Sequence, residues 1–384
     1  MTTFEDRVKG VLISAALGDA LGAPVEKLSR EEIEQKYGYV TTLKTRWYKE
    51  ASGEEVTLGK RRGNGIITDD TLMILALCRV YKKEKRHLDA YDLANEFTKE
   101  IAFRKTFIPE FDRETFILDR LFYPEKHIFL RHVLANCEPR EGGMGNMVNC
   151  GAAMYIAPIG IVNAGNPLAA YNEAIAFASG HQVSYGLEAA GVLAACVACA
   201  FSPDAAVEDV VETAIALAKD GTKQAIIALT KKAGELKKIH SSYKEVVAIL
   251  HECIAPFSPM GDDVHRKIEK VGIPSNHYTP SRLFSIEELP LALAFIVYND
   301  GGYYKSILDG INSGRDTDSI GVMVGAILGA MYGTKFIEEE DVHLLSKTNR
   351  LDFDAEAASF AEAAKEILER DLQIARKQEG IIGH

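Results

Sequence analysis

The chain has 384 residues with a formal net charge of -11; 47% of its residues are hydrophobic and 26% are charged. This balance is typical of a soluble globular protein, and the length allows one to three domains. The negative charge argues against non-specific binding to nucleic acid or to an anionic membrane, so neither is an expected partner.

The N-terminal segment and the cysteines favour a cytoplasmic protein. We expect no secretory signal sequence and no apolar run of transmembrane length. The chain has six scattered cysteines. The close pair Cys196 and Cys199 lies in an alanine-rich run without a second pair, so we interpret both as small core residues. We therefore expect reduced thiols and a cytoplasmic location.

The first predicted helix spans residues 4–21, where apolar residues recur at helical spacing. It ends within GDALGAPVE (residues 18–26), because glycine and proline break a helix. Residues 41–66 are polar and punctuated by glycine, which predicts a long loop or a small insertion, and short strands are expected only here. Trp47 is expected in a small local cluster rather than in a lid over a ligand.

An acidic cluster, Thr68-Asp69-Asp70-Thr71, directly precedes the apolar run LMILALCRVY. Residues of these types are common in the cap and first turn of a helix, where they accept backbone hydrogen bonds and match the helix dipole. Taken alone, the cluster is therefore equally compatible with ordinary capping and with a metal site.

Helical spacing continues through most of the remaining chain. Residues 138–151 are rich in glycine, and residues 255–285 contain four prolines, so both segments are predicted to be irregular. No linker, repeat or low-complexity tract separates two cores. We predict an all-α, multi-helix single domain over residues 1–384, with insertions near 41–66 and 255–285. The further predicted helices lie near residues 71–83, 88–104, 114–122, 152–163, 167–179, 184–200, 204–219, 222–251 (one or two helices), 287–299, 302–312, 319–332 and 354–378.

A second acidic cluster, Asn312–Ser319, runs into the small and apolar segment 320–332. Carboxylates two residues apart do not share a helix face, but Asp316 and Asp318 can both point inward from a turn that opens a helix. The helix that follows is apolar on nearly every side and is expected to be buried. Unpaired charges there would be costly, and a hard cation such as Mg2+ is the simplest partner. The two clusters, one in each half of the chain, predict a shared metal site.

Four motifs occur in the order found in the ADP-ribosylglycohydrolases, which the chain resembles over roughly residues 5 to 333. They are GDALGAPVE (18–26), TDDT (68–71), GAAM followed by IAPIG (151–160), and SGRDTDSIGVMVGAILGAMYG (313–333). The resemblance implies an all-α fold with a dinuclear Mg2+ (or Mn2+) centre in a cleft that holds ADP-ribose. It also implies hydrolysis of the bond between the ribose anomeric carbon and an acceptor, with an ADP-ribose-containing substrate, such as an ADP-ribosylated protein, as the partner.

The resemblance also assigns roles to individual residues. It implies a base or gate at Glu26, which together with Asp69 and Asp316 would form the catalytic set. Asp19 is assigned a structural role, holding the loop that places Glu26. The implied metal ligands are Thr68, Asp69, Asp70, Asp316, Asp318 and Ser319.

Three substrate-side assignments have competing interpretations. The run Gly142-Gly143-Met144-Gly145 either wraps a diphosphate with its backbone N–H groups, with Gly143 and Gly145 as substrate-binding residues, or is a flexible connector. His181 is either a ligand-side histidine or a core histidine. Arg315 either pairs with a phosphate or carboxylate of the ligand or forms a salt bridge that balances the aspartates.

The middle motif departs from the pattern Gly-Asn-Gly-Ala-Ala-Met-Arg that is common in the family. Cys150 stands in place of the asparagine and Tyr155 in place of the arginine, while Asn149 lies one residue early and is assigned to substrate binding. The departure leaves a second interpretation open, a glycosidase for another ribosyl, nucleoside or nucleotide-sugar compound. A third is a non-catalytic, crystallin-like ADP-ribose binder, which the intact acidic clusters oppose.

Overall fold

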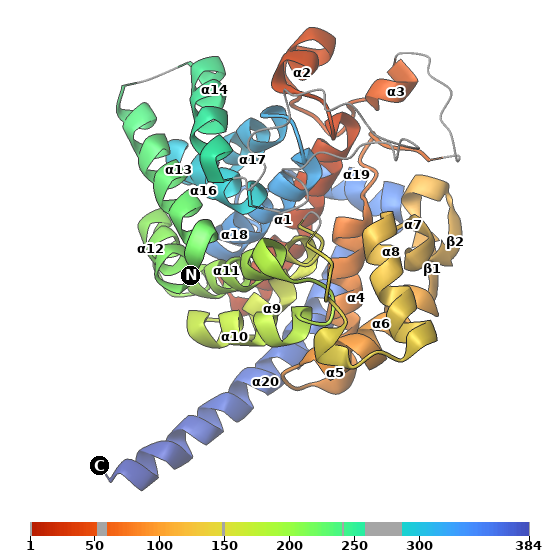
Figure 1. Cartoon of the computed structure of the whole chain (residues 1–384), viewed down its shortest axis with the longest axis vertical. Helices are drawn as coiled ribbons and strands as arrows, with labels where there is room; N and C mark the ends of the chain where they lie inside the picture. Colours follow the sequence, from red (N-terminus) through yellow and green to blue (C-terminus); the bar gives the residue numbers. More distant parts are fainter. Residues whose placement is uncertain (1, 52–59, 148–149, 240–241, 258–285, 384) are drawn as a thin grey trace.

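Two helices, α1 (Phe4–Gly22) and α18 (Thr317–Tyr332), pack against each other at the centre of the fold (Figure 1). Their contact is made by small residues spaced four apart on both helices, which run in opposite directions: Gly18 faces Gly321, and Ser14 faces Gly325. Residues at this spacing lie on one face of a helix. Because these residues lack bulk, the two backbones touch, and both helices are buried on nearly all sides.

The computed structural model describes residues 2–51, 60–147, 150–239, 242–257 and 286–383. In the N-terminal half, the elements after α1 are η1 (Ala23–Val25), α2 (Arg30–Tyr37), α3 (Tyr48–Ala51), α4 (Asp69–Glu84), α5 (Ala90–Asp92), η3 (Leu93–Phe97), α6 (Thr98–Ala102), β1 (Lys105–Ile108), η4 (Pro109–Phe111), β2 (Arg113–Phe116), α7 (Ile117–Arg120), α8 (Tyr123–Leu130), η5 (Arg131–Ala135), η6 (Pro139–Glu141), η7 (Ala153–Tyr155) and α9 (Ala157–Val162). They are followed by α10 (Pro167–Ala178), α11 (Ser184–Ala200), α12 (Val207–Leu217), α13 (Asp220–Lys238), α14 (Tyr243–Ile254), η8 (Ala255–Phe257), α16 (Glu288–Tyr298), α17 (Tyr303–Asn312), α18, α19 (Glu339–Asn349) and α20 (Phe353–Ile382).

The buried apolar side chains of the described residues form one continuous core that includes residues from both ends of the chain. Helices α11, α16 and α17 pack against α18, while α4 and the first half of α20 pack against α1. The second half of α20 leaves the body of the molecule (Figure 1), and its last buried residue is Ile367. The all-α, single-domain fold predicted from the sequence is therefore confirmed.

The short strands lie outside the segment in which they were expected. β1 and β2 form an antiparallel hairpin over residues 105–116, with Lys105 opposite Phe116. Pro109 opens the turn and Asp112 adopts a left-handed conformation that ends it, both of which favour a tight reversal over a helix. The helix predicted at 114–122 is thus wrong at its start, because residues 114–116 belong to β2. Only residues 117–120 of this range form a helix, α7.

The expectation about apolar runs also needs correction. The segment Phe4–Val25 is long and apolar enough to cross a membrane by length and composition. However, 94% of its apolar window is buried inside the protein. A helix that is surrounded by other helices has apolar residues on every face, which explains why this segment is as apolar as a membrane-spanning helix. We interpret α1 as a core helix.

The described parts of the first predicted insertion support a local aromatic cluster around Trp47. Its ring is buried, packs edge-on against Tyr48, and lies under the side chains of Lys49 and Arg62. Residues 52–59 of this insertion, and residues 258–285 of the second one, lie outside the described residues.

Candidate functional site

The structure brings the two predicted acidic clusters together at the N-terminal ends of α4 and α18. Thr68 caps α4 and Asp316 caps α18. The hydroxyl group of Ser319 donates a hydrogen bond of 3.1 Å to the carboxylate of Asp70, although 249 positions separate the two residues in the chain. All six residues assigned to the metal site are buried.

Glu26 reaches the same place from the end of η1. One carboxylate oxygen each from Glu26, Asp316 and Asp318 lies within 4.8 Å of the other two. Three oxygens at this separation repel one another strongly unless protons or a cation lie between them. Lys27, which has a positive φ of 78°, follows directly, and its backbone N–H group donates a hydrogen bond of 2.9 Å to the carbonyl group of Arg315.

Burial and crowding disfavour the charged forms of these acids in the absence of a cation. Burial, followed by the charges of Asp318 and Asp19, raises the pKa of Asp70 well above its usual range. Burial, followed by the charges of Glu26 and Asp316, has the same effect on the pKa of Asp318. A divalent cation would remove this penalty. The available ligands are carboxylate and hydroxyl oxygens, which suit hard ions such as Mg2+ and Mn2+.

Asp19 has a structural role, but a different one from that expected. It is fully buried and accepts hydrogen bonds from the backbone N–H groups of Thr68 and Thr71, and one of 2.5 Å from the Thr71 hydroxyl group. Burial and the nearby charge of Asp318 raise its pKa to about 7. Asp19 therefore joins α1 to the start of α4 instead of holding the loop around Glu26.

Two arginines that the sequence analysis did not select contact the candidate catalytic acids. Arg62 forms an ion pair with Glu26, and Arg120 forms one of 2.6 Å with Asp69. One oxygen of Asp69 is therefore committed to a guanidinium group. Isolated arginines in loops and short helices resemble ordinary surface residues in a sequence, and only their burial shows otherwise.

Comparison with known proteins agrees with this arrangement of motifs. A family model described as ADP-ribosylglycohydrolase matches residues 1–373. The chain belongs to the ADP-ribosylglycohydrolase family. This is a family of glycohydrolases, so the protein is placed among the hydrolases.

The chain is also similar to two named proteins and to one solved structure. The chain is 23% identical over 93% of its length to the uncharacterized protein YegU of Escherichia coli (strain K12), covering 96% of that protein. It is 30% identical over 43% of its length to the ADP-ribosyl-[dinitrogen reductase] glycohydrolase of Rhodospirillum rubrum, covering 47% of it. A solved structure described as an ADP-ribosylglycohydrolase-related protein complex covers 95% of this chain and is itself fully covered, with a TM-score of 0.60 and 18% identity, which shows the shared fold.

Cys150, which departs from the family motif, lies within the acidic site. Its thiol donates to Asp316 over 3.9 Å, and the ligand atoms of Cys150, Glu288 and Asp316 lie within 4.8 Å of one another. Glu288 is not among the residues predicted from the sequence. The signal was present, since Glu287-Glu288 opens the apolar helix α16 just as the two recognised acidic clusters open theirs.

Glu125 is a second acid outside the set predicted from the sequence. It is buried at the start of α8, and neither carboxylate oxygen has a hydrogen-bond partner among the described residues. A Cβ atom at Gly151, in the middle family motif, would lie 2.5 Å from one of these oxygens. Burial first, and then the charges of Asp69 and Asp316, raise the pKa of Glu125 to about 8. A buried carboxyl group without partners beside the site is a candidate for contact with a ligand.

The glycine run behaves as an anchored connector rather than as a phosphate cradle. The N–H groups of Gly142, Gly143 and Met144 are all donated to protein carbonyl groups. A Cβ atom at Gly143 would overlap the backbone of Gln182, so this glycine is needed for packing. Gly145 has a positive φ of 84° and forms part of the turn. The diphosphate role is therefore not supported, and Asn149 lies outside the described residues.

His181 and Tyr155 lie together in the aromatic core. His181 is fully buried, stacks on Tyr155, and shares a hydrogen bond of 2.8 Å with the Tyr155 hydroxyl group through Nδ1. Burial lowers the pKa of His181 to about 3. These contacts favour the core interpretation of this histidine over the ligand-side one. Tyr155 likewise packs against Phe97.

Arg315 forms a buried salt bridge. Its Nη1 atom lies 2.6 Å from Glu287, and both side chains are 2% exposed. Arg315 also has a positive φ of 75°, so its backbone turns sharply just before Asp316. The salt-bridge interpretation is favoured over contact with a ligand phosphate, and the described partner is Glu287.

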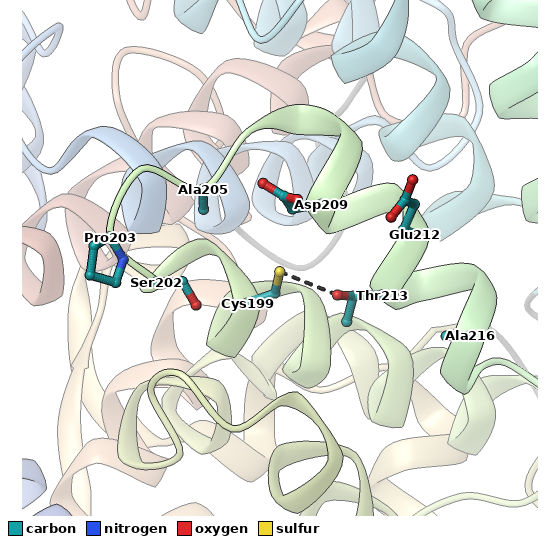
Figure 2. A pocket seen from close by; sticks show the side chains of 8 residues that line it. All are labelled: Cys199, Ser202, Pro203, Ala205, Asp209, Glu212, Thr213 and Ala216. Carbon is teal, nitrogen blue, oxygen red and sulfur yellow. Dashed lines mark hydrogen bonds between the residues drawn. The ribbon is translucent and has the colours of Figure 1, made fainter.

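The pair Cys196 and Cys199 consists of core residues, as expected. Neither belongs to a cluster of described residues that could hold a metal ion. Cys199 accepts a hydrogen bond of 3.2 Å from Thr213, at the wall of a surface pocket that Asp209 also lines (Figure 2). None of the residues assigned to the acidic site lines this pocket.

Proposed function

We propose that this ADP-ribosylglycohydrolase is a metal-dependent hydrolase. It cleaves the N- or O-glycosidic bond between ribose and its acceptor in an ADP-ribosylated protein or a small ADP-ribosyl conjugate. The observation that carries the proposal is the convergence of the two acidic helix N-termini, joined by the contact between Ser319 and Asp70. The relative from Rhodospirillum rubrum, whose name describes removal of ADP-ribose from dinitrogen reductase, supports the choice of substrate class.

The residues present fit two Mg2+ ions, with Mn2+ as the alternative. Thr68, Asp69 and Asp70 would hold the ions from α4, while Asp316, Asp318 and Ser319 would hold them from α18. When bound, the ions would orient the ribose hydroxyl groups and polarise a water molecule. The proposal places the protein in the cytoplasm, where the thiols of its six free cysteines remain reduced.

The protein side chains supply the rest of the chemistry. As the bond to the acceptor breaks, positive charge develops on the ribose ring, and the carboxylates of Asp316 and Asp318 stabilise it electrostatically. The oxygen atom of water forms the new bond to the anomeric carbon. Glu26 takes the proton from that water and returns it to the departing acceptor. Its ion pair with Arg62 holds the carboxylate in place.

A second candidate substrate class follows from Cys150. A thiol lies beside Asp316, at the position where the common family motif has an amide. This exchange removes one hydrogen-bond donor and favours a different ribosyl, nucleoside or nucleotide-sugar compound. A non-catalytic ADP-ribose binder is the least favoured function, because it would not need so many converging buried acids.

Thermal unfolding with and without Mg2+, and then with ADP-ribose, tests the proposal. A ligand that binds only the folded protein raises the melting temperature by mass action. We expect Mg2+ to stabilise the wild type but not the double variant Asp316→Asn, Asp318→Asn, and ADP-ribose to stabilise only when Mg2+ is bound. Asp204→Asn, an exposed turn residue, is the control.

The outcomes separate the candidate functions. Release of ADP-ribose from a modified protein or small conjugate would support the first. Stabilisation by Mg2+ without any response to ADP-ribose would favour the second substrate class. If Mg2+ has no effect on the wild type, the two acidic clusters do not form a metal site.

A further inference from the structure

A chain of ion pairs links the two candidate catalytic acids Glu26 and Asp69 through a third acid, Glu110. Glu110 is fully buried and pairs with both arginines, at 2.9 Å with the Nε atom of Arg62 and also with Arg120. Each arginine continues to the site, since Arg62 pairs with Glu26 and Arg120 with Asp69. The order along the chain of contacts is Glu26, Arg62, Glu110, Arg120, Asp69.

The charge of Glu110 is held by the arginines. Burial by itself raises the pKa of Glu110, but the charges of Arg120 and Arg62 outweigh it and the pKa is lowered. Both guanidinium groups are buried as well. A buried ion whose partner is removed is strongly destabilised, so neither arginine can leave Glu110 without a large cost. The two arginines are therefore held in fixed positions relative to each other.

The hairpin β1–η4–β2 presents Glu110 at its tip. Glu110 lies in η4, between Pro109 and the left-handed Asp112, which makes this turn rigid. The backbone of Glu110 accepts a hydrogen bond of 2.8 Å from the N–H group of Arg61. The backbone of Glu110 thus anchors the segment that carries Arg62, while the side chain of Glu110 pairs with Arg62 itself.

We infer that Glu110 is a positioning residue for the reaction. Through Arg62 and Arg120 it holds the carboxylates of Glu26 and Asp69 in the orientation that cation binding and catalysis need. The inference rests on the proposed function, because it concerns the same acids. None of the three residues in the middle of the chain of contacts belongs to the four family motifs.

The test compares Glu110→Gln with Glu173→Gln. Glu173 is also buried and hydrogen-bonded, to Tyr81, His87, Leu88 and Asn163, but it belongs to a different network. Both variants are expected to lower the stability measured with denaturant. Only Glu110→Gln is expected to weaken Mn2+ binding to the folded protein, by about tenfold or more, as removal of a residue that orients metal ligands typically does. Its kcat is expected to fall more than its KM changes.

Arg120→Lys separates positioning from simple loss of charge. Lysine keeps the positive charge but lacks the planar fork that bridges two carboxylates. We expect this variant also to weaken Mn2+ binding by about tenfold, and to add little to Glu110→Gln in the double variant, because both changes break the same connection. If Glu110→Gln does not fold, Arg120→Lys and Arg62→Lys provide the test.

Wild-type Mn2+ affinity and kcat in Glu110→Gln, or in Arg120→Lys, would overturn the inference and leave a purely structural network. A crystal structure of Glu110→Gln gives a readout that does not depend on the proposed function. If Glu26 and Asp69 keep their wild-type orientations there, the inference fails whether or not the wild type binds Mn2+. Failure of the wild type to bind Mn2+, with both acids displaced in the variant, would overturn the proposed function alone.

Discussion

The backbones of Gly18 in α1 and Gly321 in α18 are in direct contact where the two central helices cross. A Cβ atom added at Gly18 would lie 2.9 Å from the Cα atom of Gly321 and closer still to its carbonyl group. Asp19 follows Gly18, and Asp318 precedes Gly321 by three residues. This contact therefore sets the separation of the helices that carry two of the buried acids.

The substitution Gly18→Ala is expected to destabilise the protein by about 2–3 kcal/mol, because the added methyl group has no room and backbone must move. Gly234→Ala in α13 is the matched control. Its Cβ atom would meet only a side-chain atom of Val297 at 3.9 Å, so alanine should stabilise by about 0.5–1 kcal/mol through its higher helix propensity. Urea unfolding of both variants checks the prediction, and equal effects would contradict the close crossing.

The buried pair of Arg315 and Glu287 makes a second prediction. Arg315→Met leaves the carboxylate of Glu287 buried without this partner, and we expect a loss of about 3–5 kcal/mol. The double variant Arg315→Met, Glu287→Met should recover most of this loss, because neither member of this pair is then buried as a charge without the other. Denaturant unfolding of both single variants and the double variant measures the coupling. Additive effects would show that the two side chains do not stabilise each other.

His87 gives a prediction of pH dependence. Its ring contacts Glu173 at 2.6 Å and Asp371 at 2.9 Å. The hydrogen bond with Glu173 raises the pKa of His87 from 6.5 to about 9. The protonated ring thus stabilises the folded state fully below pH 6.5, and this contribution is lost as the pH rises through about 9.

The measurement is the difference in free energy of unfolding between wild type and His87→Gln across this range. Solvent screening reduces the effect because the ring is 40% exposed, so we expect a difference of about 1 kcal/mol at pH 6 that disappears above pH 9. Taking the difference cancels the titration of groups that do not interact with His87. A difference that stays constant from pH 6 to pH 10 would contradict the prediction.

Glu125→Gln is expected to stabilise the metal-free protein while lowering its hydrolytic activity. The pKa of Glu125 is raised from 4.5 to about 8, so its ionisation costs stability as the pH rises above 4.5 and in full above 8. The gain in the variant should therefore grow over this range and reach about 2–4 kcal/mol at pH 9. Unfolding in the presence of a chelator, and ADP-ribose release with Mg2+, give the two measurements.

A stability gain combined with lost activity is the sign of a group kept for function. If Glu125→Gln is instead less stable than the wild type at pH 9, the carboxyl group has partners in solution. Unchanged hydrolytic activity in Glu125→Gln would show that Glu125 takes no part in the reaction.

Long apolar segments could be predicted from the sequence because helical periodicity is a local property. The helix expected at 184–200 is observed as α11 over the same residues, and most others agree within a few residues. Short helices were missed when they begin with polar turns, as α2 and α19 do. The hairpin at 105–116 was missed because each strand has only four residues, too few to show an alternating pattern.

The sequence by itself determined the fold class, the family and the two acidic clusters, since each of these is written in consecutive residues. Tertiary structure alone decided what the remaining charged and aromatic residues do. His181 lies in the aromatic core, Arg315 pairs with Glu287, and Glu110 lies between two arginines. These partners lie ten or more positions apart on separate elements, and no local pattern marks them. Whether a glutamate in a turn is solvated or holds a site depends on what packs over it, and only the folded chain settles that.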